Sequence, residues 1–156
     1  MFYMQPTILI VYSSVGGNTE LTVTKVKEVL SNFGISVDTA RCVTVSPSDL
    51  EKYSLVVLAS PTYYHGLLED HFSLFIAKLQ QTPEIITDKK FSIIGLGDKK
   101  YDLDYTTEAA SILEQFIKEN NGVLAHPSLR INGYPLSKES TIIKWAERLA
   151  KVVNEM

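Results

Sequence analysis

The chain has 156 residues, of which 45% are hydrophobic and 21% are charged, and its formal net charge is −3. These values are ordinary for a globular protein, and the charge argues against a nucleic-acid-binding protein, which usually carries a basic face. No apolar run approaches the length that crosses a bilayer, and no export signal is visible in the first residues. We therefore expect a single domain over residues 1–156, in the cytoplasm and away from membranes.

The first half of the chain predicts two strands separated by a helix. Residues 7–12 are a short, nearly continuous apolar run, typical of a strand buried on both faces. A helix with one apolar stripe follows, formed by Val26, Val29, Leu30 and Phe33. Residues 35–42 alternate between polar and apolar and are typical of an edge strand. Residues 46–53 combine a serine N-cap with a proline and predict a short helical turn.

The second half repeats the alternation of strand and helix. Residues 54–60 and 91–97 are again short apolar runs, whereas the run at 122–131 contains Pro127, which favours an edge position or a split strand. Three further stripes at helical spacing are Leu68, Phe72, Phe75, Ile76 and Leu79; Ala109, Ile112, Leu113, Phe116 and Ile117; and Ile142, Trp145, Ala146, Leu149 and Val153. Because Trp145 lies on such a stripe, we expect it in the core.

Five strands that alternate with helices predict an α/β protein with a doubly wound, five-stranded parallel sheet covered by helices on both faces. In such folds ligands bind beyond the carboxyl ends of the strands, where the strand order reverses. The loops that follow the first, third and fourth strands are therefore the candidate site.

The first of these loops, "SSVGGNT" at 13–19, leads directly into a helix, whose N-terminal N–H groups attract an anion. It contains neither lysine nor arginine, while Gly16 and Gly17 allow close approach of the backbone. Side-chain donors come from Ser13, Ser14, Asn18 and Thr19. The loop therefore predicts a phosphate held by neutral donors; the alternative is a serine-rich turn with a helix cap.

Other classes of phosphate site lack their required residues. The chain has no G-x-x-x-x-G-K-[ST] motif, and "GLGDKK" does not complete a G-x-G-x-x-G fingerprint. The single cysteine, Cys42, lacks the following arginine of a phosphate-cleaving loop and has no neighbours with metal-ligand spacing, so no metal site is expected. A receiver domain would have acidic residues after the first strand, where this chain has serines.

Together, the three loops resemble those of the flavodoxin family, over essentially the whole chain. "YSSVGGNTE" is similar to the family's phosphate loop, "SPTYYHG" to the loop whose aromatic residue stacks on the flavin, and "GLGDKKYD" to the Gly-Asp-x-x-Tyr loop that covers the other face. "LRINGYP" followed by "IIKWAERL" resembles the end of short-chain flavodoxins, without the long insertion in the fifth strand. The resemblance implies the strand order 2-1-3-4-5 and bound FMN.

The resemblance assigns roles residue by residue. Thr62 would approach the FMN phosphate from the second loop, Tyr63 would stack on the inner face of the ring, and Tyr101 on the outer face. Tyr64 is the alternative for the inner position. The cofactor-binding residues implied are Ser13, Ser14, Val15, Gly16, Gly17, Asn18, Thr19, Pro61, Thr62, Tyr63, Tyr64, His65, Gly66, Gly95, Leu96, Gly97, Asp98, Tyr101 and Asp102.

Two features depart from the family. Val15 and Gly16 stand where the phosphate loop usually has hydroxyl groups, so FMN is expected to bind more weakly than in typical members. The surroundings of the flavin are expected to be mildly acidic, with Glu20, Glu69, Asp70, Asp98, Asp102 and Asp104 against Lys99 and Lys100. His71 and His126 are expected on helix and strand surfaces.

The function implied is that of a low-potential, one-electron carrier with noncovalently bound FMN. It would act as a monomer, receive electrons from a flavodoxin reductase-type donor and pass them to redox enzymes through transient contacts. No catalytic residue is expected, because the cofactor carries the redox chemistry. The alternatives are an FMN-dependent NAD(P)H:quinone-type reductase and a flavodoxin-like partner module that binds FMN weakly.

Overall fold

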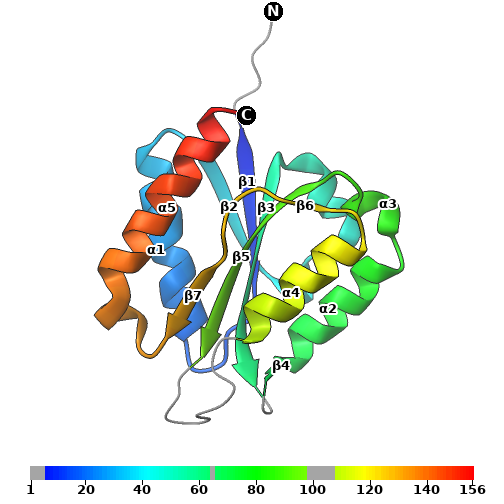
Figure 1. Ribbon diagram of the computed structural model, residues 1–156, viewed down its shortest axis with the longest axis horizontal. Helices are drawn as coiled ribbons and strands as arrows, with labels where there is room; N and C mark the ends of the chain where they lie inside the picture. Colours follow the sequence, from blue (N-terminus) through cyan, green and yellow to red (C-terminus); the bar gives the residue numbers. More distant parts are fainter. Residues whose placement is uncertain (1–5, 64–65, 98–107) are drawn as a thin grey trace, which may run out of the picture.

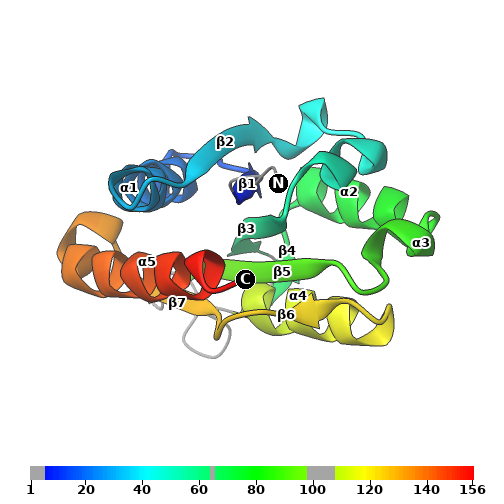
Figure 2. The ribbon, with the colours of Figure 1, turned by 90° about the horizontal axis from the view of Figure 1, so that it is seen from above.

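The structure is a computed structural model that describes residues 6–63, 66–97 and 108–156. Its centre is a twisted sheet with the strand order β2-β1-β3-β5-β6, in which β7 also pairs with β5 and β4 pairs with β3 (Figures 1 and 2). The strands are β1 (Thr7–Tyr12), β2 (Ser36–Arg41), β3 (Leu55–Tyr63), β4 (Leu67–Leu68), β5 (Lys90–Gly97), β6 (Val123–Leu124) and β7 (Leu129–Asn132). All pairings are parallel except that of β3 with β4.

Helices cover both faces of this sheet. Figure 2 shows α1 and α5 together on one side, and α2 and α4 on the other. The helices are α1 (Asn18–Asn32), α2 (Asp70–Gln80), α3 (Pro83–Ile86), α4 (Glu108–Glu119) and α5 (Glu139–Asn154), with 3-10 turns at Cys42–Thr44, Pro47–Lys52 and Pro135–Lys138. The predicted fold class is confirmed, including the strand order, since β5 is the fourth predicted strand and β6 with β7 the fifth.

The core consists of two apolar layers, one on each side of the sheet. On the α1 and α5 side, Val26 and Leu30 are fully buried with Leu149. On the other side, Phe72 lies between α2 and the sheet and is also fully buried. Each buried side chain of this size stabilises the fold by about 1.5–3 kcal/mol relative to an exposed one. The prediction that residues 35–42 form an edge strand is confirmed, since β2 ends the strand order and most of its residues are exposed.

Several details differ from the sequence predictions. Leu68 belongs to β4 rather than to the helix, which begins at Asp70. Phe33 lies just beyond the end of α1 and is exposed rather than buried. Trp145 is buried as predicted, and its indole N–H donates to the Pro127 carbonyl. His126 lies between β6 and β7 rather than on a strand, and it is only partly exposed, because its ring packs against that of Trp145; burial lowers its pKa.

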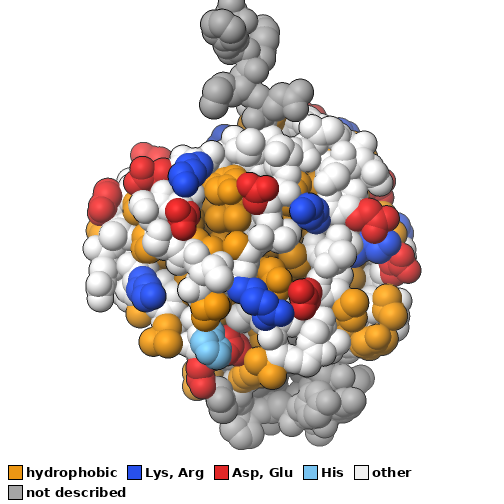
Figure 3. Space-filling model, turned by 180° about the vertical axis from the view of Figure 1, so that it is seen from behind, with side chains coloured by type: hydrophobic (Ala, Val, Ile, Leu, Met, Phe, Trp, Pro, Cys, Tyr) orange, Lys and Arg blue, Asp and Glu red, His pale blue; other side chains and the backbone are white. Residues whose placement is uncertain are grey.

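The carboxyl ends of β1, β3, β5 and β7 lie at one edge of the sheet, at the bottom of Figure 1. Among the described residues, no helix is both long and apolar enough to cross a membrane. Figure 3 shows acidic and basic side chains interspersed over the back of the molecule. In doubly wound folds ligands bind beyond the carboxyl ends of the strands. The functional residues predicted from the sequence are therefore expected at this end of the sheet.

Candidate cofactor site

The loop between β1 and α1 is anchored at its start and then turns sharply. The Ser13 N–H donates to the Ala59 carbonyl of β3 at 3.2 Å, which continues the sheet by one residue. Gly16 and Gly17 then have φ values of +84° and +88°. This left-handed backbone is strained for residues that carry a Cβ atom. The two glycines therefore determine the shape of the loop that the sequence predicted as a phosphate site.

The backbone N–H groups of residues 15–19 form no hydrogen bond with any part of the chain that the structure describes. A Cβ atom added at Gly16 or Gly17 would meet no atom within 4 Å, so this side of the loop is open. Consecutive unpaired N–H groups at a helix N-terminus suit an anion, because the helix dipole adds to their partial charges. Asn18 is exposed at this end of α1, whereas Thr19 is buried.

The end of β3 lies directly beside this loop. Thr62 and Tyr63 extend β3 beyond its predicted end and pair with Leu68 and Leu67 of β4. The Tyr63 hydroxyl lies 3.5 Å from the Val15 carbonyl, a long hydrogen bond that links the first and second loops. The structure thus brings these two loops together, as the sequence analysis expected of the site residues.

Other predicted residues of the second loop are buried or form hydrogen bonds within the protein. Pro61 is half-buried near the end of β3. The Thr62 hydroxyl oxygen accepts a hydrogen bond from the Ala109 N–H in the first turn of α4, at 3.1 Å. Gly66 has φ +101°, and its N–H donates to the Tyr63 carbonyl at 3.1 Å, which closes the turn. Thr62 therefore joins the second loop to α4.

The end of β5 supplies the third predicted group. Gly95 and Leu96 are buried, and Gly97 is half-buried with its carbonyl accepting from the Gly133 N–H at 2.8 Å. The predicted residues that lie outside the described part of the chain are Tyr64, His65, Asp98, Tyr101 and Asp102, together with the lysine pair and Asp104.

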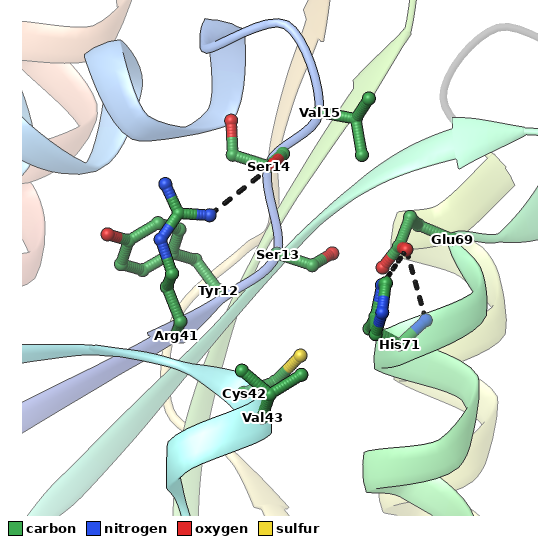
Figure 4. Close-up of a pocket in the computed structure, with 9 residues that line it drawn as sticks. All are labelled: Tyr12, Ser13, Ser14, Val15, Arg41, Cys42, Val43, Glu69 and His71. Atoms are coloured by element: carbon green, nitrogen blue, oxygen red, sulfur yellow. Dashed lines mark hydrogen bonds and ion pairs between the residues drawn. The ribbon is translucent and has the colours of Figure 1, made fainter.

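A pocket of about 170 Å³ lies between the first loop, the end of β2 and the start of α2 (Figure 4). It is lined by Tyr12, Ser13, Ser14, Val15, Arg41, Cys42, Val43, Glu69 and His71. Burial raises the pKa of the Cys42 thiol to about 11, and the nearby Glu69 carboxylate adds to this effect. The thiol is therefore protonated at neutral pH and is a poor nucleophile.

Glu69 is a buried N-cap residue, not part of an acidic surface. Its carboxylate accepts hydrogen bonds from the His71 and Phe72 N–H groups at 3.0 and 3.2 Å, and lies 2.7 Å from the His71 ring nitrogen Nδ1. Burial alone would raise the pKa of Glu69, but these hydrogen bonds outweigh it and the pKa is lowered. The expected contribution of Glu69 to an acidic surface around the site is therefore wrong.

Two residues beside the candidate site have contacts that the sequence did not predict. Arg41 binds the first loop, and Glu69 accepts hydrogen bonds at the start of α2. Arg41 comes from β2, and its guanidinium group reaches the first loop (Figure 4). It also pairs with Glu20 at 3.1 Å, so that the second acidic residue at this edge is neutralised. Among the described residues, no group of three or more potential metal ligands comes together.

With this geometry in hand, comparison with known proteins identifies the family. The family model described as flavodoxin matches residues 10–145. The chain belongs to the flavodoxin family. It is similar to the probable flavodoxin 2 of Bacillus subtilis, with 27% identity over 146 residues that cover 92% of this chain and 94% of that protein. Flavodoxins are electron-transfer flavoproteins rather than enzymes.

Solved flavodoxin structures have the same architecture. Oxidised flavodoxin 2 from Bacillus cereus superimposes with a TM-score of 0.80 at 27% identity, covering 96% of this chain and 98% of that one. Oxidised flavodoxin 1 from the same organism gives 0.79 at 20% identity, covering 96% and 97%, and at that identity the likeness shows the fold alone. Only residues 125–128 separate β6 from β7, so the chain is a short-chain flavodoxin.

The described residues fit the flavin cofactor that the family implies. A phosphate group needs several hydrogen-bond donors around one point, and the first loop offers a row of unpaired N–H groups together with two glycines that have open space beside them. The neighbouring Tyr63 provides an aromatic ring at the second loop.

Proposed function

We propose that this flavodoxin is a low-potential, one-electron carrier that holds FMN noncovalently and shuttles electrons between a flavodoxin reductase-type donor and acceptor enzymes. The main support is the row of unpaired N–H groups at residues 15–19, on a loop that ends in the Gly-Asn-Thr sequence of the family. When bound, the flavin supplies the redox chemistry. The chain's own residues then bind it, orient it and limit its contact with water.

Distinct parts of the edge would hold distinct parts of the cofactor. The first loop would bind the phosphate, with the Thr62 hydroxyl hydrogen still available as a donor because only its oxygen is used by Ala109. Tyr63 would cover one face of the ring and Tyr101 the other. Gly97, at the carboxyl end of β5, and Asp98, the next residue in the sequence, would meet the polar edge of the ring through their backbone. The remaining members of the proposed set are Ser13, Ser14, Val15, Gly16, Gly17, Asn18, Thr19, Pro61, Tyr64, His65, Gly66, Gly95, Leu96 and Asp102.

The proposal includes no catalytic side chain. The thiol of Cys42 is buried and its pKa is raised to about 11 by burial, which is opposite to what a reactive cysteine needs. Glu69 is engaged by the backbone of α2. We further propose that the chain acts as one domain over residues 1–156, as a cytoplasmic monomer with transient redox partners.

The phosphate assignment is tested by comparing FMN with riboflavin, which has the same ring but no phosphate. Asn18→Ala should weaken FMN binding about tenfold, because a hydrogen bond to a charged group contributes about 1.5 kcal/mol or more. Riboflavin affinity should stay nearly unchanged. Asn32→Ala at the other end of α1 is the matched control and should alter neither. Equal losses for FMN and riboflavin in Asn18→Ala would contradict the assignment.

The electron-carrier assignment has a separate test. The purified protein should contain one FMN per chain, and it should oxidise added NADPH only when a flavodoxin reductase is present. Rapid oxidation of NADPH by the protein alone would instead identify an FMN-dependent reductase. A protein that retains no FMN and binds none when it is added would be a partner module.

A further inference from the structure

Arg41, the last residue of β2, reaches across to the first loop and contacts it at Ser14. Its Nη1 donates to the Ser14 carbonyl at 3.4 Å, and its Nη2 lies 3.1 Å from Oε2 of Glu20. The guanidinium carbon lies 5.4 Å from the centre of the Tyr12 ring, within the range of a cation–π contact. Figure 4 shows this side chain between Tyr12 and Ser14.

Further contacts close the network around Arg41. The Tyr12 hydroxyl donates to Oε1 of Glu20 at 3.4 Å, and the Glu20 N–H donates to the Ser14 hydroxyl at 3.4 Å. Burial raises the pKa of Tyr12, and the charge of Glu20 adds to this effect, so the hydroxyl remains a donor at neutral pH. One arginine thereby connects the end of β1, the start of the loop and the first turn of α1.

The network leaves a defined part of the loop free. The carbonyl and the hydroxyl of Ser14 are both engaged on the side of Arg41 and Glu20. The chain then reverses through Gly16 and Gly17. The N–H groups of residues 15–19 take no part in this network and have no partner in the described chain. Holding donors in place before the ligand arrives reduces the entropy that binding loses.

The role of Arg41 is geometric more than electrostatic. Its side chain and that of Glu20 are 46% and 49% exposed, and an exposed ion pair contributes little to stability. The two charges also cancel, so the pair adds little net attraction for an anion. Two different nitrogens of the rigid guanidinium fork donate to the Ser14 carbonyl and to the Glu20 carboxylate, a spacing that the single nitrogen of a lysine does not reproduce.

We propose that Arg41 is a positioning residue for the phosphate group of the bound ligand, holding the Ser14 carbonyl and Glu20 so that the N–H groups of residues 15–19 stay available. This inference rests on the proposed function, because it takes the ligand phosphate to bind at the first loop. It adds a residue from β2, outside the three loops at which the cofactor is otherwise proposed to bind.

The test compares Arg41→Gln, Arg41→Lys and the control Lys25→Gln by their dissociation constants for FMN and riboflavin. Lys25 is also paired with glutamates, at 3.1 and 3.3 Å, but lies further along α1, and these glutamates are in α1 and α5. Arg41→Gln should weaken FMN about tenfold, equivalent to about 1.4 kcal/mol, and leave riboflavin nearly unchanged. Arg41→Lys should lose as much, since lysine retains the charge without the fork. Lys25→Gln should bind both ligands like the wild type.

A second measurement uses the apoprotein and inorganic phosphate. In the wild type, added phosphate should shift the amide NMR resonances of Gly16 and Gly17, and in Arg41→Gln this response should need higher phosphate concentrations. This readout separates the positioning of the loop from any effect on the flavin ring.

The outcomes distinguish the two proposals. Full FMN affinity in Arg41→Lys would show that charge alone matters and would overturn the positioning role. Equal losses for FMN and riboflavin in Arg41→Gln, or no loss for either, would also overturn it while the proposed function stands. A wild-type protein that binds neither FMN nor inorganic phosphate would instead overturn the proposed function.

Discussion

The first loop and the end of β3 lie side by side at the carboxyl edge, but different kinds of contact hold them in shape. The first loop depends on two glycines with positive φ and on Arg41, which is 27 residues from Ser14 along the chain. The end of β3 is held by strand pairing, since Tyr63 pairs with Leu67, and by α4 through the Thr62 hydroxyl. One half of the site is therefore shaped by glycine conformation and one arginine, and the other by regular secondary structure packed around it.

This difference has a consequence for mutational sensitivity. The first loop makes few contacts of its own, so changes in β2 or α1 reach it directly. The end of β3 is part of a continuous unit that includes β4, the N-terminus of α2 and, through the Thr62 hydroxyl, α4. We expect changes in the β3 region to lower the stability of the fold, and changes in the first loop to act mainly on ligand binding.

The largest effect is expected at Gly95, in β5 behind the end of β3. A Cβ atom there would lie 2.6 Å from the Ala110 Cβ and 2.7 Å from the Ala110 backbone nitrogen. Gly95→Ala must push α4 away from the sheet, and with it the Ala109 N–H that binds Thr62. We expect a loss of about 3 kcal/mol in the free energy of unfolding, measured by chemical denaturation.

A second substitution tests the origin of this loss. Ala110→Gly in the Gly95→Ala background removes one of the two closest atoms but leaves the backbone nitrogen. It should therefore restore part of the lost stability and not all of it. A Gly95→Ala variant as stable as the wild type would mean that α4 moves freely, and that the β3 region is not the rigid unit described above.

Glu69→Ala should have the second largest effect. The substitution leaves the N–H groups of His71 and Phe72 at the start of α2 without their acceptor. Loss of an N-cap side chain costs about 0.5–2 kcal/mol, and we expect the upper end because Glu69 is buried. Glu84→Ala, in the first turn of α3, replaces an exposed glutamate and should change the stability far less.

The contribution of Glu69 should also depend on pH. Since its pKa is lowered in the folded protein, the stabilisation is fully present above the usual value of 4.5 and is lost as pH falls through the folded value. The difference in unfolding free energy between the wild type and Glu69→Gln should thus be constant near neutral pH and shrink in acid. A difference that grows in acid would contradict the lowered pKa.

The long strands could be predicted from the sequence because each is a nearly continuous apolar run, and the helices because their apolar residues recur at helical spacing. It did not predict β4, because a two-residue strand has no period of its own. Leu68 lies four residues before Phe72, which is also the spacing of a helical stripe. Phe33 follows Leu30 at helical spacing as well, but α1 ends at Asn32 and leaves it exposed.

The candidate site likewise contains some residues that the sequence reveals and others that only the structure reveals. The glycines and the Gly-Asn-Thr ending of the first loop are local signals, and the structure gives both Gly16 and Gly17 positive φ values. Arg41 could not be found from the sequence, since an arginine at the end of an edge strand is ordinarily a solvated side chain. Glu69 was missed because glutamate is not among the favoured N-cap residues. Long-range contacts and burial need the tertiary structure.

Gly17→Ala should produce a smaller loss of stability than the changes above. A Cβ atom at this position meets nothing within 4 Å, so the only cost is the positive φ, about 1–2 kcal/mol. Gly17→Asn should recover part of that cost, because asparagine tolerates this conformation. Thermal or chemical unfolding of the two variants gives the comparison. Equal destabilisation by alanine and asparagine would mean that space, rather than φ, limits this position.

Val15→Ser should change stability least and is the sharpest probe of the first loop. Val15 is 63% exposed, so its replacement should alter the free energy of unfolding by no more than about 0.5 kcal/mol. A serine would restore a hydroxyl group beside the unpaired N–H groups, and one more hydrogen bond contributes about 0.5–1.5 kcal/mol, or roughly two- to tenfold in FMN affinity. Val43→Ser is the matched control, because Val43 has the same exposed fraction but follows β2 outside the loop. If Val15→Ser and Val43→Ser bind FMN equally well, the side chain at residue 15 does not face the phosphate, and the backbone N–H groups alone must hold it.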